Sequence, residues 1–371
     1  MRIGTITFHG SYNYGSVLQA YALQQFVLYL YPQSKYEIIN FRPEVQKEMY
    51  WQTYPPVTLK TVVKGIMRLP YWNFLKRQAE AYEEFFVKYL NLTAEVTESE
   101  LPQLSDKYDC FISGSDQIFN IRNRDFSLAY LLNFTDSPNK LSYAASMGPL
   151  AIDWGKYDKD KYVKYLRQFK FLSLREQHSK EMADYLLKTN TSEIHIDPTF
   201  LLTAEEWRKI QSKRNYNNGK YILIYCLEPS KRHLEIAKKL SKETKLPIVS
   251  TGYRNKYDYC NPFVKFYDAG PTDFLALIDN AEMVLTSSFH GTAFSIIYDK
   301  KFWVIDGMED NRICNLLKLM GLETNNIPVD QSKDFAKQQP QTAKAVNAYS
   351  VIMKERERSK EYFLRAFNSI I

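Results

Sequence analysis

Short apolar segments alternate with amphipathic segments along most of the chain, and this alternation limits the fold more than any other feature. Apolar runs typical of buried strands lie at 2–8, 36–41, 108–116, 140–148 and 169–176 in the first half, and at 220–228, 246–253, 282–288 and 301–306 in the second. Segments such as 16–30 and 231–245 space their apolar residues as amphipathic helices do. Repeated strand–helix alternation predicts an α/β fold of parallel sheets with helices on both faces.

The chain is too long for one hydrophobic core, because single cores stop growing near about 250–300 residues and this sequence has 371. A polar, turn-rich stretch, SKRNYNNGK, separates the two halves. We predict a first domain at 1–205, a second at 206–340, and a C-terminal helix within 341–371 that packs back on the first domain. Two such domains in tandem bring the carboxyl ends of their strands to one cleft, where parallel sheets bind ligands.

Composition and motifs exclude several classes of protein. The net charge of +7 favours anionic ligands, but the basic residues form no stripe with interleaved aromatics, so we predict no nucleic-acid partner. The four cysteines lack metal or redox spacing, and there is no HExxH or phosphate-loop motif. The sequence therefore predicts neither a bound metal nor a cofactor.

Membrane insertion is not expected from this sequence. No stretch approaches the ~18 apolar residues that span a bilayer, and the first residues predict a strand, not a signal peptide. Together with the widely spaced cysteines, this predicts a cytoplasmic protein. The basic, aromatic segment 58–77 is either a helix packed on the first domain or a peripheral contact with the inner face of the cytoplasmic membrane.

Two loops of the first half carry small and polar residues where a predicted strand ends. The first contains Asn13, Tyr14 and Gly15, and the second contains Gly114, Ser115, Asp116 and Gln117. Glycine lets a backbone approach a ligand, and the helix after the first loop presents an N-terminus that attracts anions. Both loops are interpreted as lining a ligand site; a plain tight turn and an Asp116 helix cap are the structural alternatives.

Arg175 directly follows the apolar run that begins at residue 169. A cation in that position is costly unless it meets an anion, and the planar guanidinium suits a carboxylate or a phosphate. Either Arg175 binds an anionic ligand, or it forms a structural salt bridge for which Asp197 is the suggested partner.

The segment TSSFHGTAFS at 286–295 places His290 where a strand ends and a helix begins. A helix N-terminus attracts anions, and histidine exchanges protons near neutral pH. We predict that His290 is catalytic, with packing as the alternative, and that the site also includes Ser287, Ser288 and Gly291. Arg312, after the next strand, faces the same edge or lies exposed on its helix.

Six segments, in this order, resemble the polysaccharide pyruvyl transferase family: GSYNYGSVLQAYAL, ISGSDQIFN, LSYAASMG, FLSLRE, IDPTFLL and LTSSFHGTAFSIIYDK. The resemblance implies two Rossmann-like, GT-B-like domains that face each other across a cleft. It also implies transfer of the pyruvyl group of phosphoenolpyruvate onto two hydroxyls of a sugar. A cyclic ketal forms and phosphate is released.

The resemblance also implies roles for three residues. The serine-x-arginine pattern of SLRE makes Arg175 an anion-binding residue, and the histidine after the late strand makes His290 the acid or base. Relatives carry a lysine after the next strand, where this chain offers Arg312, which binds phosphate but donates protons poorly. Phosphoenolpyruvate is the implied co-substrate. The implied acceptor is a surface polysaccharide, capsular or exopolysaccharide, or its lipid-linked precursor.

Two other functions are compatible with these features. A GT-B glycosyltransferase would use a nucleotide sugar and would need an acidic residue for the ribose, for which Glu309 and Asp310 are candidates. A carbohydrate-binding protein would keep the fold without turnover. The presence of Arg175, His290 and Arg312 together favours an enzyme.

Overall fold

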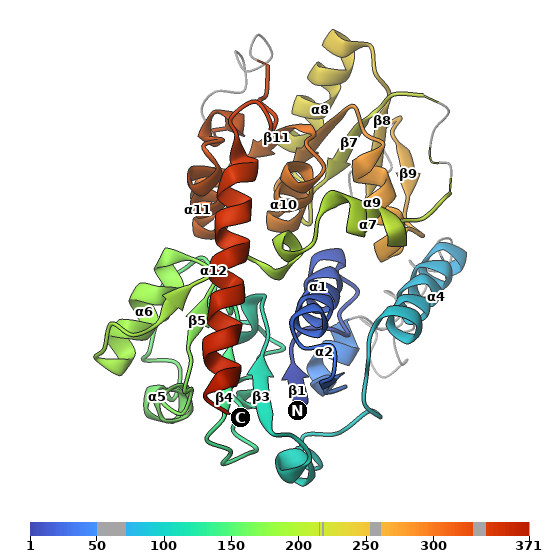
Figure 1. Cartoon of the computed structure of the whole chain (residues 1–371). Coiled ribbons are helices and arrows are strands. Elements are labelled where there is room, and N and C mark those ends of the chain that lie inside the picture. Colours follow the sequence, from blue (N-terminus) through green and yellow to red (C-terminus); the bar gives the residue numbers. More distant parts are fainter. Residues whose placement is uncertain (50–71, 215, 217–218, 253–260, 329–338, 371) are drawn as a thin grey trace. The chain divides into compact units, whose positions relative to one another are not determined.

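The computed structural model describes residues 1–49, 72–214, 216, 219–252, 261–328 and 339–370 (Figure 1). They group into two compact units: 1–49, 86–202 and 350–370 form the first, and 72–85 with the described part of 203–349 forms the second. Residues 72–85 therefore group with the second unit, although the predicted boundary places them in the first domain. Of the basic segment 58–77, residues 58–71 lie outside the described part of the chain.

The first unit contains a four-stranded parallel sheet in the order β2-β1-β3-β4. A parallel pair, β5-β6, continues it through bridges that join Leu141 to Phe171 and Ala145 to Leu174. The strands are β1 Arg2–Ile6, β2 Lys35–Ile38, β3 Cys110–Ser113, β4 Lys140–Ser142, β5 Ser173–Leu174 and β6 Glu193–Ile194. The main helices are α1 Tyr14–Leu30, α2 Glu44–Met49, α5 Lys159–Leu166, α6 Gln177–Leu187 and α12 Ala348–Asn368, with short 3-10 helices η2 Leu101–Lys107, η3 Gln117–Phe119, η4 Leu128–Leu131 and η5 Pro198–Leu201.

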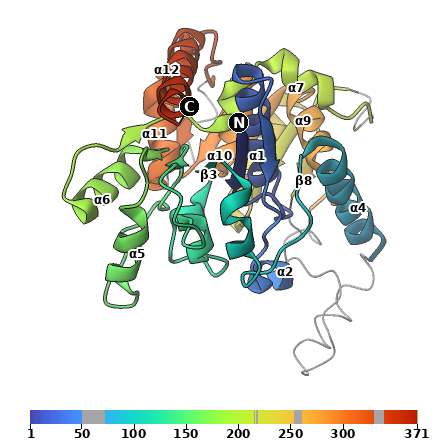
Figure 2. The same cartoon turned by 60° about the horizontal axis from the view of Figure 1, so that its bottom comes forward.

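Helices cover both faces of this first sheet. On one face, Ile6 and Phe111 join an apolar cluster that includes residues of α5 and α6, which lie side by side in Figures 1 and 2. On the other face, the ring of Phe363 in α12 lies 4.9 Å from that of Tyr143 beside β4, and 6.1 Å from that of Phe26 in α1. Because both faces are covered, β3 buries every residue, as strands of parallel sheets do.

A buried histidine supports the packing of α12. The imidazole of His195 lies 4.5 Å from the ring of Tyr362, and its Nδ1 lies 2.9 Å from the Ser173 hydroxyl oxygen. Burial, followed by the positive charges of Arg358 and Arg365, lowers the pKa of His195 from 6.5 to about 3. His195 is therefore neutral in the folded protein over the whole range in which a free histidine takes up a proton.

Acidification is expected to destabilise the protein through His195. A group with a lowered folded pKa contributes stability that is complete above its unfolded pKa and is lost as the pH falls toward the folded value. Between about pH 7 and about pH 5 the expected loss in the free energy of unfolding is about 2 kcal/mol, measured by urea unfolding. Burial also lowers the pKa of His9 and His233, so the comparison protein is His195→Gln, which retains both of them. An equal loss in the wild type and in His195→Gln would contradict this role.

The second unit contains a six-stranded parallel sheet in the order β12-β11-β10-β7-β8-β9. The strands are β7 Ile222–Tyr225, β8 Ile248–Thr251, β9 Val264–Phe266, β10 Met283–Thr286, β11 Lys301–Ile305 and β12 Asn326–Ile327. The main helices are α4 Trp72–Tyr89, of which residues 72–85 belong here, α7 Ala204–Ile210, α8 Lys231–Thr244, α9 Pro271–Asp279, α10 Phe289–Ile297 and α11 Asn311–Met320.

Helices also cover both faces of the second sheet. The apolar side chains of α8 pack with Ile222, Ile224 and Leu285 on one face. On the other face, the ring of Tyr225 in β7 lies 4.8 Å from the ring of Phe274 in α9. The rings of Phe274 and of Phe294 in α10 lie 5.8 Å apart. The predicted α/β fold with parallel sheets and helices on both faces is confirmed.

The boundaries of individual elements follow the sequence pattern less closely. The strand predicted at 169–176 pairs as a strand only at Ser173–Leu174, and the last helix begins at Ala348, not near 341. Before α12, the backbone N–H groups of Gln341 and Lys344 bond to the side chains of Asn325 and Asp299, each at 2.8 Å. These long-range hydrogen bonds hold the chain out of the helix. Among the described residues, no helix is long and apolar enough to cross a membrane.

Candidate active site

The strand order of the first unit singles out the carboxyl ends of β1 and β3. In parallel sheets, ligands bind where neighbouring strands send their connections in opposite directions. The connection from β1 leads to β2 on one side, and β3 lies on the other side, so this point falls between β1 and β3. The loops that leave these two strands contain the predicted residues Asn13, Tyr14, Gly15, Gly114, Ser115, Asp116 and Gln117.

The second unit has its own switch point, between β7 and β10. From β7 the chain continues to β8 and β9 on one side, and β10 with β11 and β12 lies on the other. Ser287 and Ser288 leave β10 here, and His290 and Gly291 occupy the first turn of α10. The loops selected from the sequence therefore lie at the one place in each sheet that strand order favours for a ligand.

Asn13 ends the loop after β1 and caps α1. Its side-chain oxygen accepts a hydrogen bond from the N–H of Gly15 at 3.0 Å. Tyr14 and Gly15 are buried, whereas Asn13 is only partly buried. Of these three predicted residues, Asn13 is thus the one whose side chain remains available at the surface of the first unit.

Asp116 connects the two loops of the first unit. Its carboxylate accepts the N–H of Gln117 at 2.8 Å, which caps η3, and the hydroxyl of Ser16 in α1 at 2.5 Å. Its backbone is left-handed, with φ at 73°, which costs a non-glycine residue on the order of 1–3 kcal/mol. Asp116 therefore does cap η3, which was the structural alternative. A cap needs neither a strained backbone nor a hydrogen bond to α1, so capping alone does not explain this residue. Strain of this kind clusters at functional sites.

Gly114 and Ser115 hold this loop against its neighbours. A Cβ at Gly114 would lie 2.9 Å from Cβ of Thr7, so only glycine allows the loops after β1 and β3 to approach this closely. The Ser115 hydroxyl donates to the carbonyl oxygen of Ala144 at 2.7 Å. Gln117 accepts from the side-chain amide of Asn120 at 2.9 Å. These contacts fix the loop against the neighbouring segments of the first unit.

Arg175 lies among three carboxylates. Its guanidinium donates to Asp197 at 2.9 Å and lies 3.4 Å from Glu176 and 4.0 Å from Asp116. Burial lowers the pKa of this 2% exposed side chain, but the three carboxylates outweigh burial and raise it. The salt bridge with Asp197, which the sequence left open as an alternative, is observed. The protein itself neutralises this arginine.

The carboxylates around Arg175 have further partners. Asp197 accepts from the N–H of Thr199 at 3.0 Å and from its hydroxyl at 2.8 Å. Glu176 accepts from the Ser146 hydroxyl at 2.7 Å. This network connects the segments after β1, β3, β4, β5 and β6. Glu176 and Ser16 were not predicted; Glu176 directly follows Arg175, and this adjacency is the signal that would have indicated it.

The backbone around His290 is fixed by its neighbours. Thr286 donates its hydroxyl to the carbonyl oxygen of Tyr225 at 2.6 Å and accepts the N–H of Ser288 at 3.0 Å. A Cβ at Gly291 would lie 3.0 Å from the Tyr225 ring and would overlap the Thr286 hydroxyl. His290 is 6% exposed, and its ring meets that of Phe289 edge-on at 5.2 Å. The loop is therefore held tightly between β7 and β10.

Ser287 and Arg312 have specific partners in the second unit. Burial raises the pKa of the Cys226 thiol to about 12, while hydrogen bonds with Ser287 act in the opposite direction. Arg312, in the first turn of α11, turns back on Asp310, with Nε at 3.0 Å and Nη2 at 2.5 Å from its carboxylate. The sequence suggested either a cleft-facing or an exposed Arg312; its side chain is partly buried and paired within its own loop.

An ion pair that was not predicted lies at the same edge of the second sheet. Asp306 follows β11, and both of its carboxylate oxygens accept from Nη1 of Arg232 at 2.5 Å. Nη2 of Arg232 donates to the carbonyl oxygen of Pro328 at 2.6 Å. Arg232 lies in the first turn of α8, so this pair joins the ends of three strand–loop segments.

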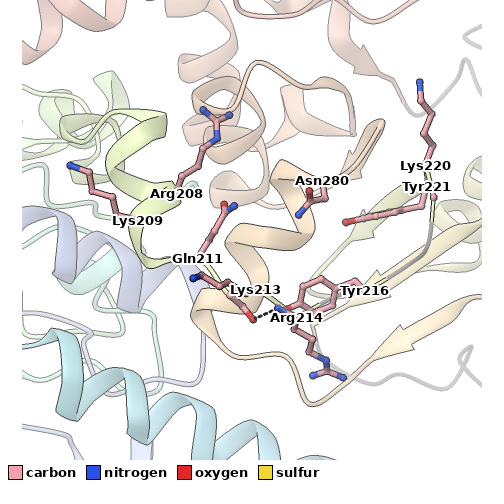
Figure 3. A pocket seen from close by; sticks show the side chains of 11 residues that line it. Arg208, Lys209, Gln211, Lys213, Arg214, Tyr216, Lys220, Tyr221 and Asn280 are labelled. Atoms are coloured by element: carbon pink, nitrogen blue, oxygen red, sulfur yellow. Dashed lines mark hydrogen bonds between the residues drawn. The ribbon is translucent and has the colours of Figure 1, made fainter.

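A hollow of the second unit lies away from these residues (Figure 3). Its volume is about 650 Å³, and its lining includes Arg208, Lys209, Lys213, Arg214 and Lys220 but no predicted site residue. Two of these arginines already pair with carboxylates, Arg208 with Asp279 and Arg214 with Asp268. Since the hollow also lies at the amino end of β7 and at the C-terminus of α9, we do not assign the chemistry to it. Within the described ranges, no group of three or more His, Cys, Asp or Glu residues is placed to hold a metal ion.

Comparison with solved structures identifies the architecture. The UDP-N-acetylglucosamine 2-epimerase from Rickettsia bellii is 11% identical, with a TM-score of 0.57 over 100% of this chain and 98% of that chain. The S. aureus MnaA–UDP co-structure is 12% identical, with a TM-score of 0.57 over 100% and 97%. The UDP-GlcNAc 2-epimerase from Neisseria meningitidis bound to UDP-GlcNAc is 11% identical, with a TM-score of 0.51 over 98% and 94%. At these identities the likeness shows the fold alone, and it confirms the predicted GT-B-like α/β class.

Sequence comparison identifies the family. No curated protein matches the chain. A model of the family described as polysaccharide pyruvyl transferase matches residues 13–307, a span that includes every predicted site residue except Arg312. Because this match covers most of the sequence, the chain belongs to the polysaccharide pyruvyl transferase family.

Proposed function

We propose that this protein transfers the pyruvyl group of phosphoenolpyruvate onto two hydroxyls of a sugar, forming a cyclic ketal and releasing phosphate. The observation that carries the proposal is the position of His290, in the first turn of α10 directly after β10, at the switch point of the second sheet. Helix N-termini at this edge favour anions, and the proposed donor carries a phosphate and a carboxylate. The proposed acceptor is a sugar of a surface polysaccharide or of its lipid-linked precursor.

In the proposed reaction, His290 takes the proton of the first sugar hydroxyl and passes it to C3 of the donor. The C3–H bond forms as the double bond between C2 and C3 is lost, and the sugar oxygen bonds to C2. The bond between C2 and the phosphate oxygen then breaks. The second hydroxyl bonds to C2 and its proton leaves with phosphate, so that atoms and charge balance. A positioned histidine contributes by general acid–base catalysis.

The structure changes the proposed role of Arg175. Because Asp116, Glu176 and Asp197 surround its guanidinium, we propose that Arg175 positions these carboxylates and does not itself meet the donor. Asp116 is the member that bonds to α1 at the switch point of the first sheet. We propose that Asp116, with Asn13 and Gln117, accepts hydrogen bonds from sugar hydroxyls. Arg312 remains the proposed cation for phosphate, in exchange with Asp310.

The test follows phosphate released from phosphoenolpyruvate in the presence of candidate sugars and lipid-linked sugars, with mass spectrometry of the acceptor. Acceptor-dependent phosphate release, together with an acceptor enlarged by one ketal-linked pyruvate, is the expected result. Consumption of a UDP-sugar with no phosphate release would favour the GT-B glycosyltransferase instead. Binding of sugar with neither reaction would favour a carbohydrate-binding protein. A cytoplasmic location and a membrane role for 58–77 stay predictions.

A further inference from the structure

A second histidine lies at the switch point of the second sheet. His233 is in the first turn of α8, the helix that follows β7, and is 9% exposed. It stands at helical spacing from Ile236, Ala237 and Leu240, which pack into the apolar core of the second unit. His233 therefore lies on the inward face of α8, where this core meets the carboxyl edge of the sheet.

The cap of α8 determines which nitrogen of this imidazole carries the proton. The backbone N–H of Ser230 donates to Nδ1 of His233 at 3.1 Å, and the Ser230 hydroxyl lies 2.6 Å from the same nitrogen. A nitrogen that accepts a hydrogen bond carries no proton, so the neutral ring has its proton on Nε2. Burial lowers the pKa of His233; nearby Asp306 raises it and Arg232 lowers it further. The ring is thus neutral near pH 7, with Nε2 as its donor.

Nε2 of His233 is buried and, among the described residues, has no hydrogen-bond acceptor. A buried donor without an acceptor costs about 1–3 kcal/mol. Native proteins retain few such groups, and each of them requires an explanation. The cap already uses Nδ1, so helix capping explains half of this imidazole and leaves the Nε2–H without a structural role.

The surroundings indicate the kind of acceptor. The acidic side chain that raises the pKa of the ring, Asp306, is engaged through both oxygens by Arg232. The N-terminus of α8 adds a positive potential at the same edge. We propose that His233 is a substrate-binding residue whose Nε2–H donates to a phosphate or carboxylate oxygen. This inference rests on the proposed function only in naming phosphoenolpyruvate as the source of that oxygen.

The test compares two substitutions that separate the two ring nitrogens. His233→Asn keeps an acceptor near the position of Nδ1 for the Ser230 N–H and deletes the Nε2–H; His233→Gln places an amide N–H near Nε2. Inorganic phosphate and phosphoenolpyruvate are titrated into the whole chain by calorimetry. We expect Kd to rise by about 10-fold or more for His233→Asn and by no more than about 2-fold for His233→Gln. Ser230→Ala, which weakens the cap but keeps Nε2–H, is the matched control and should bind like the wild type.

Thermal unfolding without ligand provides an independent readout. His233→Asn keeps an acceptor for the Ser230 N–H, and the Nε2–H that it deletes makes no hydrogen bond to the described residues, so its melting temperature should stay close to that of the wild type, whereas a purely structural histidine would lose stability. Equal phosphate affinity in the wild type and His233→Asn, or no phosphate binding by the wild type, would overturn the inference. If phosphate affinity depends on His233 but no acceptor supports phosphate release, the proposed function fails and the inference stands.

Discussion

Replacement of His290 by alanine is expected to lower the rate of acceptor-dependent phosphate release by about 100- to 10,000-fold, the usual contribution of a general acid–base group. The reason is the proton transfer proposed above, from the sugar hydroxyl to C3 of the donor. Release of phosphate from phosphoenolpyruvate is measured under single-turnover and steady-state conditions. The loss should appear mainly in kcat, because the other groups that bind the donor remain in place.

The control for His290→Ala must separate chemistry from packing. The rings of His290 and Phe289 are in edge-on contact at 5.2 Å, so His290→Ala also removes packing in the first turn of α10. Phe289→Leu loses the same ring contact but retains the imidazole, and it should keep kcat within about 10-fold of the wild type. If His290→Ala turns over at the wild-type rate, or if both variants lose activity equally, His290 is a packing residue and the proposed mechanism is wrong.

Replacement of Arg175 by methionine is expected to lower the free energy of unfolding by about 3–5 kcal/mol, because it leaves buried carboxylates without their counterion. Asp197 and Glu176 lie 2.9 and 3.4 Å from the guanidinium. Urea unfolding followed by circular dichroism measures the change. The matched control is Arg2→Met, which breaks an ion pair with Asp109 in which the arginine is 52% exposed. An exposed pair of that kind contributes less than about 1 kcal/mol.

A double substitution identifies which charge causes the loss. Asp197→Asn in the Arg175→Met background removes one of the uncompensated charges, so the two changes should be less destabilising together than the sum of the single effects. Family resemblance instead implies that Arg175 binds the donor, so its loss would weaken binding of phosphoenolpyruvate and leave the free energy of unfolding unchanged. If Arg175→Met unfolds like the wild type but binds phosphoenolpyruvate weakly, Arg175 meets the donor, and the role proposed here is wrong.

The sequence located the loops that lie at the two switch points, because local patterns report strand ends directly. An apolar run followed by small and polar residues marks the carboxyl end of a strand, and this pattern was sufficient to select Asp116 and His290. The same reasoning gave approximate boundaries for the helices, since spacing of apolar residues records the helical period. For Arg175 it suggested Asp197 as a partner but could not decide between that salt bridge and an anionic ligand, and it did not indicate Asp116, because both carboxylates lie far away in the sequence.

His233 is a residue that the sequence alone could not select. In the sequence it is one of several polar residues at the start of a basic helix, and nothing in KRHLEIAKKL distinguishes it. Its significance depends on Ser230, which occupies Nδ1, and on burial of Nε2. Hydrogen-bond satisfaction is a property of the folded surroundings, so no sequence pattern records it.

By itself, the sequence determined the α/β class, the order of strands and helices along the chain, and the family, because these depend on local periodicity and on motifs. Only the tertiary structure decided strand order, and with it the two switch points where His290 and Asp116 lie. It also decided that Arg175 pairs within the protein. Both depend on contacts between residues far apart in the chain, which form only when loop closure brings the strands of each sheet together.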